Sequence, residues 1–470
     1  MYRRVSLAAA LVLCAMPAVA QQPPAAPPSP VNIPPAAGPA NPATADDRYR
    51  FAPNLSEEQE VALDRTPGGV RFTWPRANTR AWDTALLGIR SWGAEAEPWV
   101  EIVARGASIR HDMDPNALGW RWLNLTGLRD QLADGGVVEL RTHGVTIEAN
   151  RATLRLFANN LDLRGTILVL APHPDDAEIA AFGLYAGRKT TIVTVTSGNA
   201  GDFNYRADVS DPAEHYLWKG YLRAVDSVTV PWQGEIPPDR CFNLGYFDAR
   251  LATMKQAPDQ PVPEMYGPNQ DVAPYRRANI GRLLSVGSRT NTWNHLVEDL
   301  ADVFRKVKPD LVVMPHPWLD THLDHEYTSV AAIEALEKAG GNPTFLLYTN
   351  HSFSNLYPFG PAGTTVSLPP WSAADLAVER VYAHPLTPEL QRRKLYALES
   401  MHDLRPSPDE QRTCDLPGVA RRPDYPRVPS VDYFRRGPRA EEMFFVYSRD
   451  AAKDVIRTFL ARAASASEPR

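Results

Sequence analysis

Residues 166–182 read TILVLAPHPDDAEIAAF, and this stretch predicts an α/β fold. An apolar run that suits a buried strand is followed by a polar turn and then by the start of an apolar helix. In a parallel α/β sheet, such a turn lies at the carboxyl end of its strand, where ligands bind. The turn carries one imidazole, His173, and two adjacent carboxylates, Asp175 and Asp176. One carboxylate can therefore bind a metal ion while its neighbour stays free to act as a base.

The same alternation of strands and helices continues towards the C-terminus. Strands are expected at residues 166–171, 191–195, 310–315, 344–349 and 444–447, and helices at 177–187, 213–226, 293–307, 324–338, 386–402 and 450–461. This order predicts a Rossmann-like, mostly parallel sheet flanked by helices, in a domain of residues 164–470. Two long irregular segments, residues 253–288 and 351–385, interrupt it. The aromatic residues of the second segment suit either a substrate wall or packing on the outside of the domain.

The region before this domain has a different pattern. Residues 21–45 are rich in Pro and Ala and are expected to form a linker. Residues 46–163 are expected to form a β-rich ancillary domain, with a sandwich as the candidate architecture. The evidence is the alternation of apolar and polar residues at 99–104, 120–125, 137–141, 145–148 and 153–157. An earlier stretch, residues 55–64, is expected to be helical.

The N-terminus and the composition indicate where the protein works. Residues 1–20 combine a basic start, a short apolar run and an A-x-A site ending at Ala20, as in a secretory signal peptide. We expect an exported protein, periplasmic or secreted, without a transmembrane segment after signal removal. In an oxidising compartment Cys241 and Cys414 either pair or remain two buried thiols. The 470 residues carry a net charge of −5, which does not suggest a nucleic-acid partner, and the sequence does not indicate the oligomeric state.

A second informative run, LVVMPHPWLDTHLDHE, covers residues 311–326. It again joins an apolar strand to a helix, so we expect it at the same edge of the sheet as His173. Taken singly, an Asp in such a turn can be no more than a helix cap. Two such turns at one edge favour a functional site. His322 can face a substrate there, while Asp324 can hold His322 or orient a metal ligand.

The residue types at this edge suit a divalent metal centre. His173, Asp176 and His325 supply two nitrogens and one carboxylate, and a catalytic zinc site needs three such ligands with a position left for water. Zn²⁺ is the expected ion, with Fe²⁺ as the alternative. Asp175 is then left to deprotonate the water.

The two runs together resemble the signatures of the LmbE-like, or PIG-L, family of zinc-dependent de-N-acetylases. The first signature, His-Pro-Asp-Asp with a Glu close behind, matches residues 173–176 and Glu178. The second, His-Pro-Asp-His, matches residues 322–325 with Leu323 in place of Pro. The resemblance covers about residues 164–462. Weaker family-like features occur at residues 196–201, 244–248, 394–398 and 441–444.

The resemblance implies a role for each residue of the two signatures. It implies that the metal ligands are His173, Asp176 and His325. It also implies that Asp175 is the general base and that His322 stabilises the oxyanion and protonates the leaving amine. Asp324 would then tune His322.

Two positions depart from the family pattern. Asp320 stands where members that act on thiol-linked glucosamine have an aromatic residue, which counts against that substrate class. The usual Arg-x-x-Glu pattern is missing from residues 215–223. Arg206 or Arg223 is therefore the candidate for a substrate-binding arginine.

The expected function is that of an exported metal-dependent hydrolase, which removes an N-acetyl group from an amino sugar in a glycan or glycoconjugate. Acetate and a free amine would be released. One alternative is a metal-dependent amidase that acts on a non-sugar N-acyl substrate. Another is a catalytically silent glycan-binding protein, in which the β-rich domain would hold a sugar through Trp99, Trp120, Trp122 and Asn124.

Overall fold

The computed structural model describes residues 46–75, 82–93, 97–114, 118–201, 205, 208–283, 289–352, 355–404 and 433–466. The chain divides into two compact units, residues 1–33 and 34–470, and every described residue belongs to the second unit. The predicted signal peptide, the predicted linker and Cys414 lie outside the described residues. Cys241 is buried.

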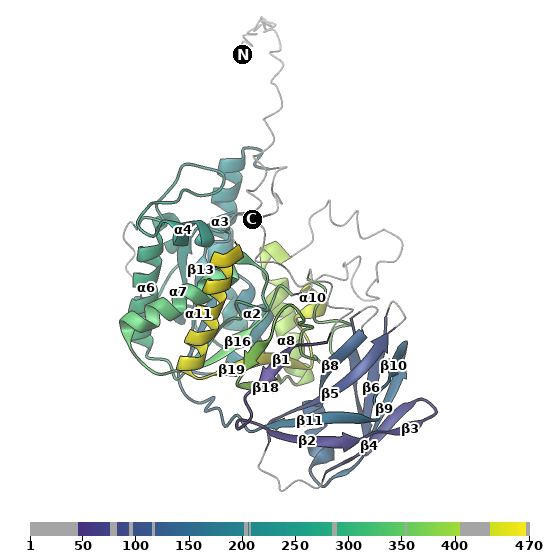
Figure 1. The fold of residues 1–470 in the computed structure, drawn as a ribbon. Helices are drawn as coiled ribbons and strands as arrows, with labels where there is room; N and C mark the ends of the chain where they lie inside the picture. The colour runs from purple at the N-terminus through teal and green to yellow at the C-terminus, as the bar shows by residue number, and fades with distance from the viewer. Residues whose placement is uncertain are drawn as a thin grey trace, which may run out of the picture. The chain divides into compact units, whose positions relative to one another are not determined.

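Within the part of the chain that the structure describes, the central sheet has seven strands. Their order is β14 (Cys241–Tyr246), β13 (Thr190–Thr196), β12 (Ile167–Ala171), β15 (Leu311–Pro315), β16 (Thr344–Tyr348), β19 (Glu441–Tyr447) and β18 (Arg380–Pro385). Figure 1 labels β13, β16, β18 and β19 among them. The first five strands run parallel, whereas β19 is antiparallel to both of its neighbours. The predicted α/β class with a mostly parallel sheet is therefore confirmed.

The direction in which strands are added reverses between β12 and β15. The chain builds β12, β13 and β14 on one side and then returns to build β15 and β16 on the other. In open α/β sheets, ligands bind at such a switch point, outside the carboxyl ends of the strands. Both signature runs begin at these two strands, so the topology brings them to one edge of the sheet.

Both faces of the central sheet are covered by helices, as Figure 1 shows. Leu168 and Leu170 of β12 belong to the hydrophobic cluster that includes helices α6 (Trp293–Val307), α7 (Leu323–Ala339) and α11 (Arg449–Ala466). Ile167 and Val169 belong to the opposite cluster, with α2 (Asp176–Tyr185) and α8 (Pro388–Glu399). Burial on both faces explains why the strands read as continuous apolar runs. Among the described residues, this region also contains the α-helices α3 (Pro212–Thr229), α4 (Leu251–Gln256), α5 (Ala273–Arg276) and α10 (Tyr433–Arg436).

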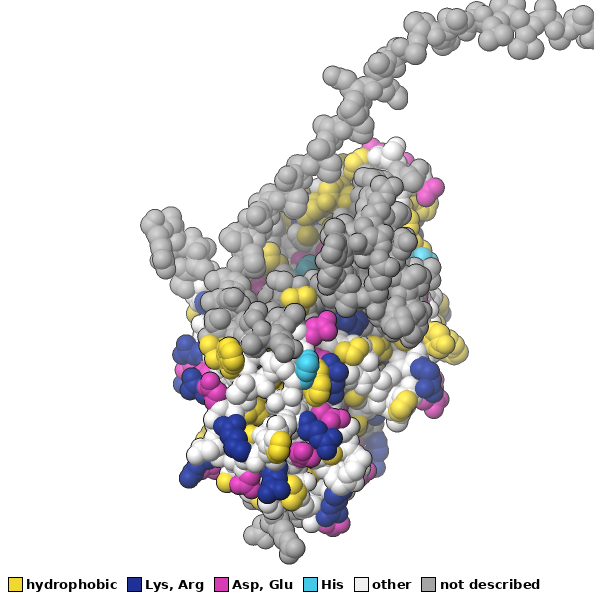
Figure 2. All heavy atoms as spheres, turned by 90° about the vertical axis from the view of Figure 1, so that its right-hand side faces the viewer, with side chains coloured by type: hydrophobic (Ala, Val, Ile, Leu, Met, Phe, Trp, Pro, Cys, Tyr) yellow, Lys and Arg dark blue, Asp and Glu magenta, His cyan; other side chains and the backbone are white. Residues whose placement is uncertain are grey.

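The N-terminal region contains two antiparallel sheets that share one hydrophobic cluster, as in a β-sandwich. One sheet contains β2 (Glu57–Ala62), β5 (Thr84–Gly93), β8 (Leu118–Asn124), β10 (Val145–Ile147) and β11 (Arg151–Phe157). The other contains β3 (Asp64–Thr66), β4 (Gly69–Trp74), β6 (Trp99–Ala104), β7 (Ala107–Asp112) and β9 (Gly136–His143). A short helix, α1 (Arg129–Leu132), precedes β9. The predicted β-rich region is confirmed. On the molecular face shown in Figure 2, basic and acidic side chains are interspersed.

The prediction of a helix at residues 55–64 is wrong, because this stretch contains β2. Strand β2 pairs with β11, so that Glu58 lies opposite Arg155 and forms an ion pair with it. Arg151 of β11 also forms an ion pair with Glu60, which lies diagonally across the two strands. The glutamates raise the local helix propensity, but partners on a distant strand favour the extended conformation.

Two strands of the central sheet were not predicted, β14 and β18. Asn243 and Gly245 interrupt the apolar run of β14, and β18 lies in the segment that was expected to be irregular. That segment also contains β17 (Leu376–Val378), which pairs with β1 (Tyr49–Phe51). Its described aromatic residues Tyr357, Phe359 and Trp371 are buried, and Tyr357 also lines a pocket, so the segment contributes both to packing and to a pocket wall. None of the helices in the described ranges is long and apolar enough to cross a membrane.

Candidate metal centre

The candidate site lies at the carboxyl ends of the central strands. The turn after β12 carries His173, Asp175 and Asp176, and the turn after β15 carries Asp320 and His322, with His325 in the first turn of α7. Two further strands contribute residues from their ends. Asp248 follows β14, and Asn350 follows β16. Four strands therefore contribute to one site.

Three of the predicted residues place their donor atoms at the corners of a small triangle. His173 Nδ1 lies 3.2 Å from Asp176 Oδ2 and 3.2 Å from His325 Nε2. The third edge, from His325 Nε2 to Asp176 Oδ2, measures 3.0 Å. Metal–ligand bonds of about 2.0–2.2 Å around one zinc ion place neighbouring donors roughly 3.0–3.5 Å apart. The two nitrogens and one carboxylate oxygen thus fit a shared divalent ion.

The outward nitrogens of the two imidazoles face carboxylates. His173 Nε2 lies 3.2 Å from Asp248 Oδ1 and 3.3 Å from Asp324 Oδ2, and His325 Nδ1 lies 3.0 Å from Asp320 Oδ2. Such carboxylates hold the proton on the outer nitrogen and direct the lone pair of the inner one towards a metal. Burial by itself lowers the pKa of His325, but Asp176 and Asp320 raise it to about 9. The buried cage therefore favours positive charge, which a divalent ion supplies.

The two oxygens of the Asp176 carboxylate have different partners. Asn350 Nδ2 donates a hydrogen bond to Asp176 Oδ1 at 2.8 Å, while Oδ2 is the oxygen that faces His173 and His325. Because Asn350 engages Oδ1, Oδ2 is the oxygen presented to an ion.

Asp324 supports His173. The Asp324 carboxylate accepts hydrogen bonds from the amides of Ala249 (2.6 Å) and Leu251 (3.2 Å), besides its contact with His173. The hydrogen bond between Asp324 and His322 involves the backbone of Asp324, whose amide donates to His322 Nδ1 at 3.2 Å. Asp324 was expected either to hold His322 or to orient a metal ligand. The contact of its carboxylate with His173 fits the second role.

Asp175 is buried next to the triangle and is held by Arg223. Arg223 Nη2 donates to Asp175 Oδ2 at 2.9 Å and to the carbonyl oxygen of Pro174 at 2.9 Å. Asp175 has a φ of 128°, a conformation that costs a non-glycine residue about 1–3 kcal/mol. Its side chain makes no capping hydrogen bond to α2, so capping does not account for it. Burial raises the pKa of Asp175 to about 7 against the lowering effect of Arg223, which suits a group that takes up a proton.

His322 lies next to the triangle, with its ring centroid 5.1 Å from that of His325, and it is half-buried. It begins α7 as the N-cap residue, with Nδ1 accepting from the Asp324 amide. The proton of the neutral ring is therefore on Nε2. Burial, together with His173 and His325, lowers the pKa of His322 to about 4. His322 is thus a neutral hydrogen-bond donor whose ring lies edge-on to that of His173, with ring centroids 4.7 Å apart.

The sequence reasoning missed two residues of this site. Asp248 ends a weak family-like feature that received no role, and Asn350 directly follows an expected strand. A signal was available for Asn350, because it follows an expected strand at the edge where the signatures meet. Asp248 had no such signal, because β14 was not predicted. Of the two candidate arginines, Arg223 contacts Asp175, whereas Arg206 lies outside the described residues.

Comparison with protein families identifies the class. Residues 168–336 match the family model described as PIG-L: GlcNAc-PI de-N-acetylase. The matched range runs from β12 to α7 and contains His173, Asp176 and His325. The chain therefore contains a PIG-L de-N-acetylase family domain. No curated protein matches the chain.

Solved structures give distant similarities. A deacetylase–teicoplanin complex from the biosynthesis pathway of teicoplanin is 14% identical, with 61% of this chain and 99% of that chain covered and a TM-score of 0.31. GalB, the 4-carboxy-2-hydroxymuconate hydratase of Pseudomonas putida KT2440, is 14% identical, with 60% and 95% covered and a TM-score of 0.28. An acetyl xylan esterase of the rumen bacterium Butyrivibrio proteoclasticus is 11% identical, with 62% and 84% covered and a TM-score of 0.16.

Proposed function

We propose that this protein is an exported, divalent-metal-dependent N-deacetylase that acts on an amino sugar in a glycan or glycoconjugate. The observation that carries the proposal is the triangle of His173, Asp176 and His325 with a buried carboxylate, Asp175, beside it. A PIG-L family domain contains all four residues. The donor set suits Zn²⁺, with Fe²⁺ as the alternative.

The ion, when bound, would act as a Lewis acid and lower the pKa of water. Asp175 accepts a proton from the attacking water, whose oxygen forms a bond to the acetyl carbon. Arg223 keeps the Asp175 carboxylate in position for this transfer. The acetyl oxygen gains negative charge, and the Nε2–H of His322 donates a hydrogen bond to it.

The C–N bond then breaks, and the nitrogen leaves as a free amine. It takes the proton that Asp175 gained from the water, because neutral His322 has only the Nε2–H that it donates to the acetyl oxygen. Water is thus consumed, and acetate and amine are released in equal amounts. Asp248, Asp320 and Asp324 take part only through the imidazoles that they orient.

The glycan-binding alternative finds little support in the β-rich region. Trp122 and Asn124 are buried, and Trp120 packs against the hydrophobic core. Trp99 already stacks on His143, and the guanidinium of Arg110 lies over its ring. These side chains are therefore engaged within the protein instead of forming an open platform for a sugar.

The proposal is tested by measuring metal content and acetate release with the purified protein. The substrate panel contains N-acetylated glycans and, as the competing class, N-acyl amino acids. We expect one divalent ion per chain and acetate from a glycan, with both lost in His325→Ala. The matched control is His295→Ala, because His295 lies on α6 and is bonded to the Thr290 carbonyl. A protein without a bound ion, or full activity in His325→Ala, would overturn the mechanism, and release from acyl amino acids alone would shift the substrate class.

Export is tested separately by locating the protein after expression and sequencing its N-terminus. We expect cleavage after Ala20 and recovery outside the cytoplasm. An intact N-terminus on cytoplasmic protein would refute export and leave the catalytic proposal standing.

A further inference from the structure

A further histidine, which belongs to neither signature, lies beside the candidate metal triangle. His351 follows β16, and its ring centroid lies 4.7 Å from that of His325, with the two rings nearly perpendicular. It is 5.2 Å from the ring centroid of His322. Asp176, His325 and His351 each offer one ligand atom, and these atoms lie within 4.8 Å of one another. The described site therefore holds an imidazole to which the mechanism assigns no role.

The backbone of His351 is held by the turn that carries the second signature. Its carbonyl oxygen accepts hydrogen bonds from the amide (2.8 Å) and the hydroxyl (2.9 Å) of Thr321. Its amide donates to Asp320 Oδ2 at 3.3 Å. The same carboxylate oxygen contacts His325 Nδ1. Asp320 therefore positions His325 and His351 together.

The imidazole of His351 is oriented by two side chains, those of Asn355 and Tyr433. Nδ1 lies 3.0 Å from Asn355 Oδ1 and 3.3 Å from the hydroxyl of Tyr433. An amide oxygen only accepts hydrogen bonds, so His351 Nδ1 carries the proton and Nε2 carries the lone pair. A neutral imidazole with its outer nitrogen bonded in this way is the usual form of a metal-ligating histidine.

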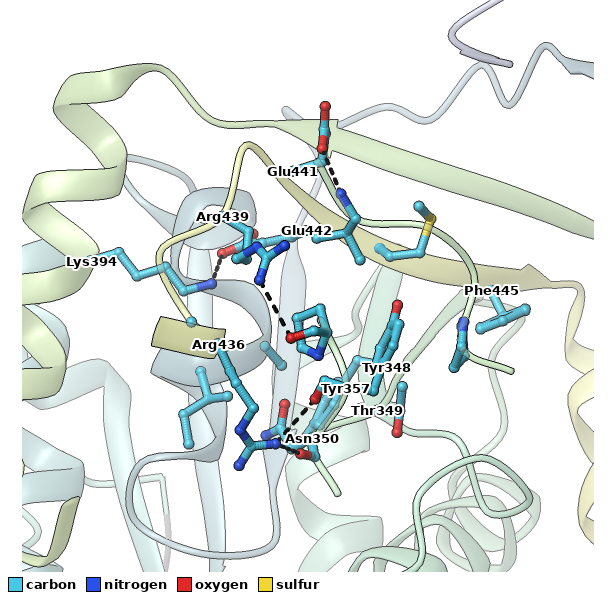
Figure 3. A pocket seen from close by; sticks show the side chains of 17 residues that line it. Tyr348, Thr349, Asn350, Tyr357, Lys394, Arg436, Arg439, Glu441, Glu442 and Phe445 are labelled. Atoms are coloured by element: carbon cyan, nitrogen blue, oxygen red, sulfur yellow. Dashed lines mark hydrogen bonds and ion pairs between the residues drawn. The ribbon is translucent and has the colours of Figure 1, made fainter. Parts of the chain in front are cut away.

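Tyr433 is itself held by neighbouring residues. The guanidinium of Arg436 lies 4.1 Å from the Tyr433 ring centroid. The same Arg436 donates to the carbonyl oxygens of Asn350 (2.8 Å) and Tyr357 (3.3 Å), as Figure 3 shows. Helix α10 is thereby tied to the end of β16, so the contact between Tyr433 and His351 is supported on both sides.

We propose that His351 is a fourth protein ligand of the ion, binding through Nε2 beside His173, Asp176 and His325. Asn355 and Tyr433 are then positioning residues for it. The inference rests on the proposed metal centre and extends its donor set to three nitrogens and one oxygen. Catalytic zinc sites usually have three protein ligands and a position left for water. A fourth ligand should make this site bind its ion more tightly, and the water of the proposed mechanism would then take a fifth position.

The test measures metal affinity and coordination in the full chain, independently of activity. Co²⁺ is titrated into metal-free protein, its visible absorption spectrum is recorded, and its dissociation constant is obtained by competition with a chelator. For His351→Ala and His351→Gln we expect a weakening of more than roughly 100-fold, because supporting residues alone account for roughly 10–100-fold. The Co²⁺ spectrum should change in both variants as one nitrogen donor is lost.

Two variants serve as comparisons. Tyr433→Phe should weaken binding by roughly 10-fold, the lower end of the range for supporting residues, because Asn355 still holds His351 Nδ1. It should keep the Co²⁺ spectrum. His384→Ala removes a buried histidine that is bonded to Tyr382 and to the Gly183 carbonyl, and it should change neither affinity nor spectrum. His351→Gln retains a polar side chain of similar length, so it carries the test if His351→Ala does not fold.

Wild-type affinity and an unchanged Co²⁺ spectrum in His351→Gln would overturn the assignment of His351. In that case metal binding and acetate release by the wild-type protein would still support the proposed function. Failure of the wild-type chain to bind Co²⁺ would instead overturn both proposals together.

Discussion

Replacing Asp320 with Asn should weaken metal binding although Asp320 is not one of the proposed metal ligands, because its carboxylate contacts the ligand His325. Asp320 is completely buried, and its Oδ2 accepts hydrogen bonds from His325 Nδ1 (3.0 Å) and the Asn350 amide (2.8 Å). Its Oδ1 accepts one from the His322 amide at 3.2 Å. An Asn side chain offers one acceptor oxygen where Asp offers two. One of these N–H groups therefore faces an NH₂ group, and the negative charge beside His325 is lost.

The substitution has two effects of different size and kind. Removal of the carboxylate behind a metal-ligating histidine typically lowers metal affinity by roughly 10–100-fold, which corresponds to about 1.4–2.8 kcal/mol. A buried N–H left without an acceptor lowers the free energy of unfolding by about 1–3 kcal/mol. Asp320→Asn should therefore bind Zn²⁺ more weakly and should also unfold at a lower urea concentration when metal-free.

The two effects are separated by a matched control. Zn²⁺ affinity is measured by chelator competition, and stability is measured by urea unfolding of the metal-free protein. Asp299→Asn removes a buried carboxylate that binds Arg276 and Tyr246 instead of a histidine of the site. This control should lose stability and keep Zn²⁺ affinity. An unchanged affinity in Asp320→Asn, or an equal loss of affinity in Asp299→Asn, would refute the reasoning that Asp320 orients His325.

Three further predictions concern single residues. Asp175→Asn should lower kcat by about 10²–10⁴-fold, as expected for loss of a general base, and retained metal content would distinguish it from a ligand variant. His322→Ala should lower kcat by about 10²–10³-fold with metal retained, because it loses the oxyanion donor; unchanged kcat would argue against that role. Burial raises the pKa of Glu441 to about 7, so the folded state keeps a proton that the unfolded state releases at lower pH. Stability should therefore fall as pH rises towards 7, by at most about 1.4 kcal/mol per pH unit, and urea unfolding across pH 5–8 should show a flatter dependence in Glu441→Gln.

The parts of the site that lie within one turn could be predicted from the sequence. His173, Asp175 and Asp176 are within four consecutive residues after an apolar run, and their proximity does not depend on the rest of the fold. The parallel sheet was predictable because both of its faces are buried, which leaves continuous apolar strands separated by helices. The error at β2 shows the limit, since local helix propensity was overridden by pairing with arginines of β11.

Contacts between distant turns could not be predicted in the same way. Asp324 is a neighbour of His322 in the chain, yet its carboxylate lies against His173. Asp248 reaches the same nitrogen from the end of β14, a strand that was not predicted. These contacts depend on the order of the strands and on the packing of the turns, neither of which has a local pattern.

The chain's two short signatures, with the apolar strands before them, were thus sufficient for the fold class and for three candidate ligands. They were sufficient because local spacing and burial determine the pattern of apolar and polar residues along the chain, and this pattern predicts strands and helices. The assignment of each carboxylate to an imidazole required the folded arrangement, as did the approach of His351 and Tyr433 to the site. Such contacts join residues far apart in the chain, and only the strand order and the packing of side chains bring them within hydrogen-bonding distance.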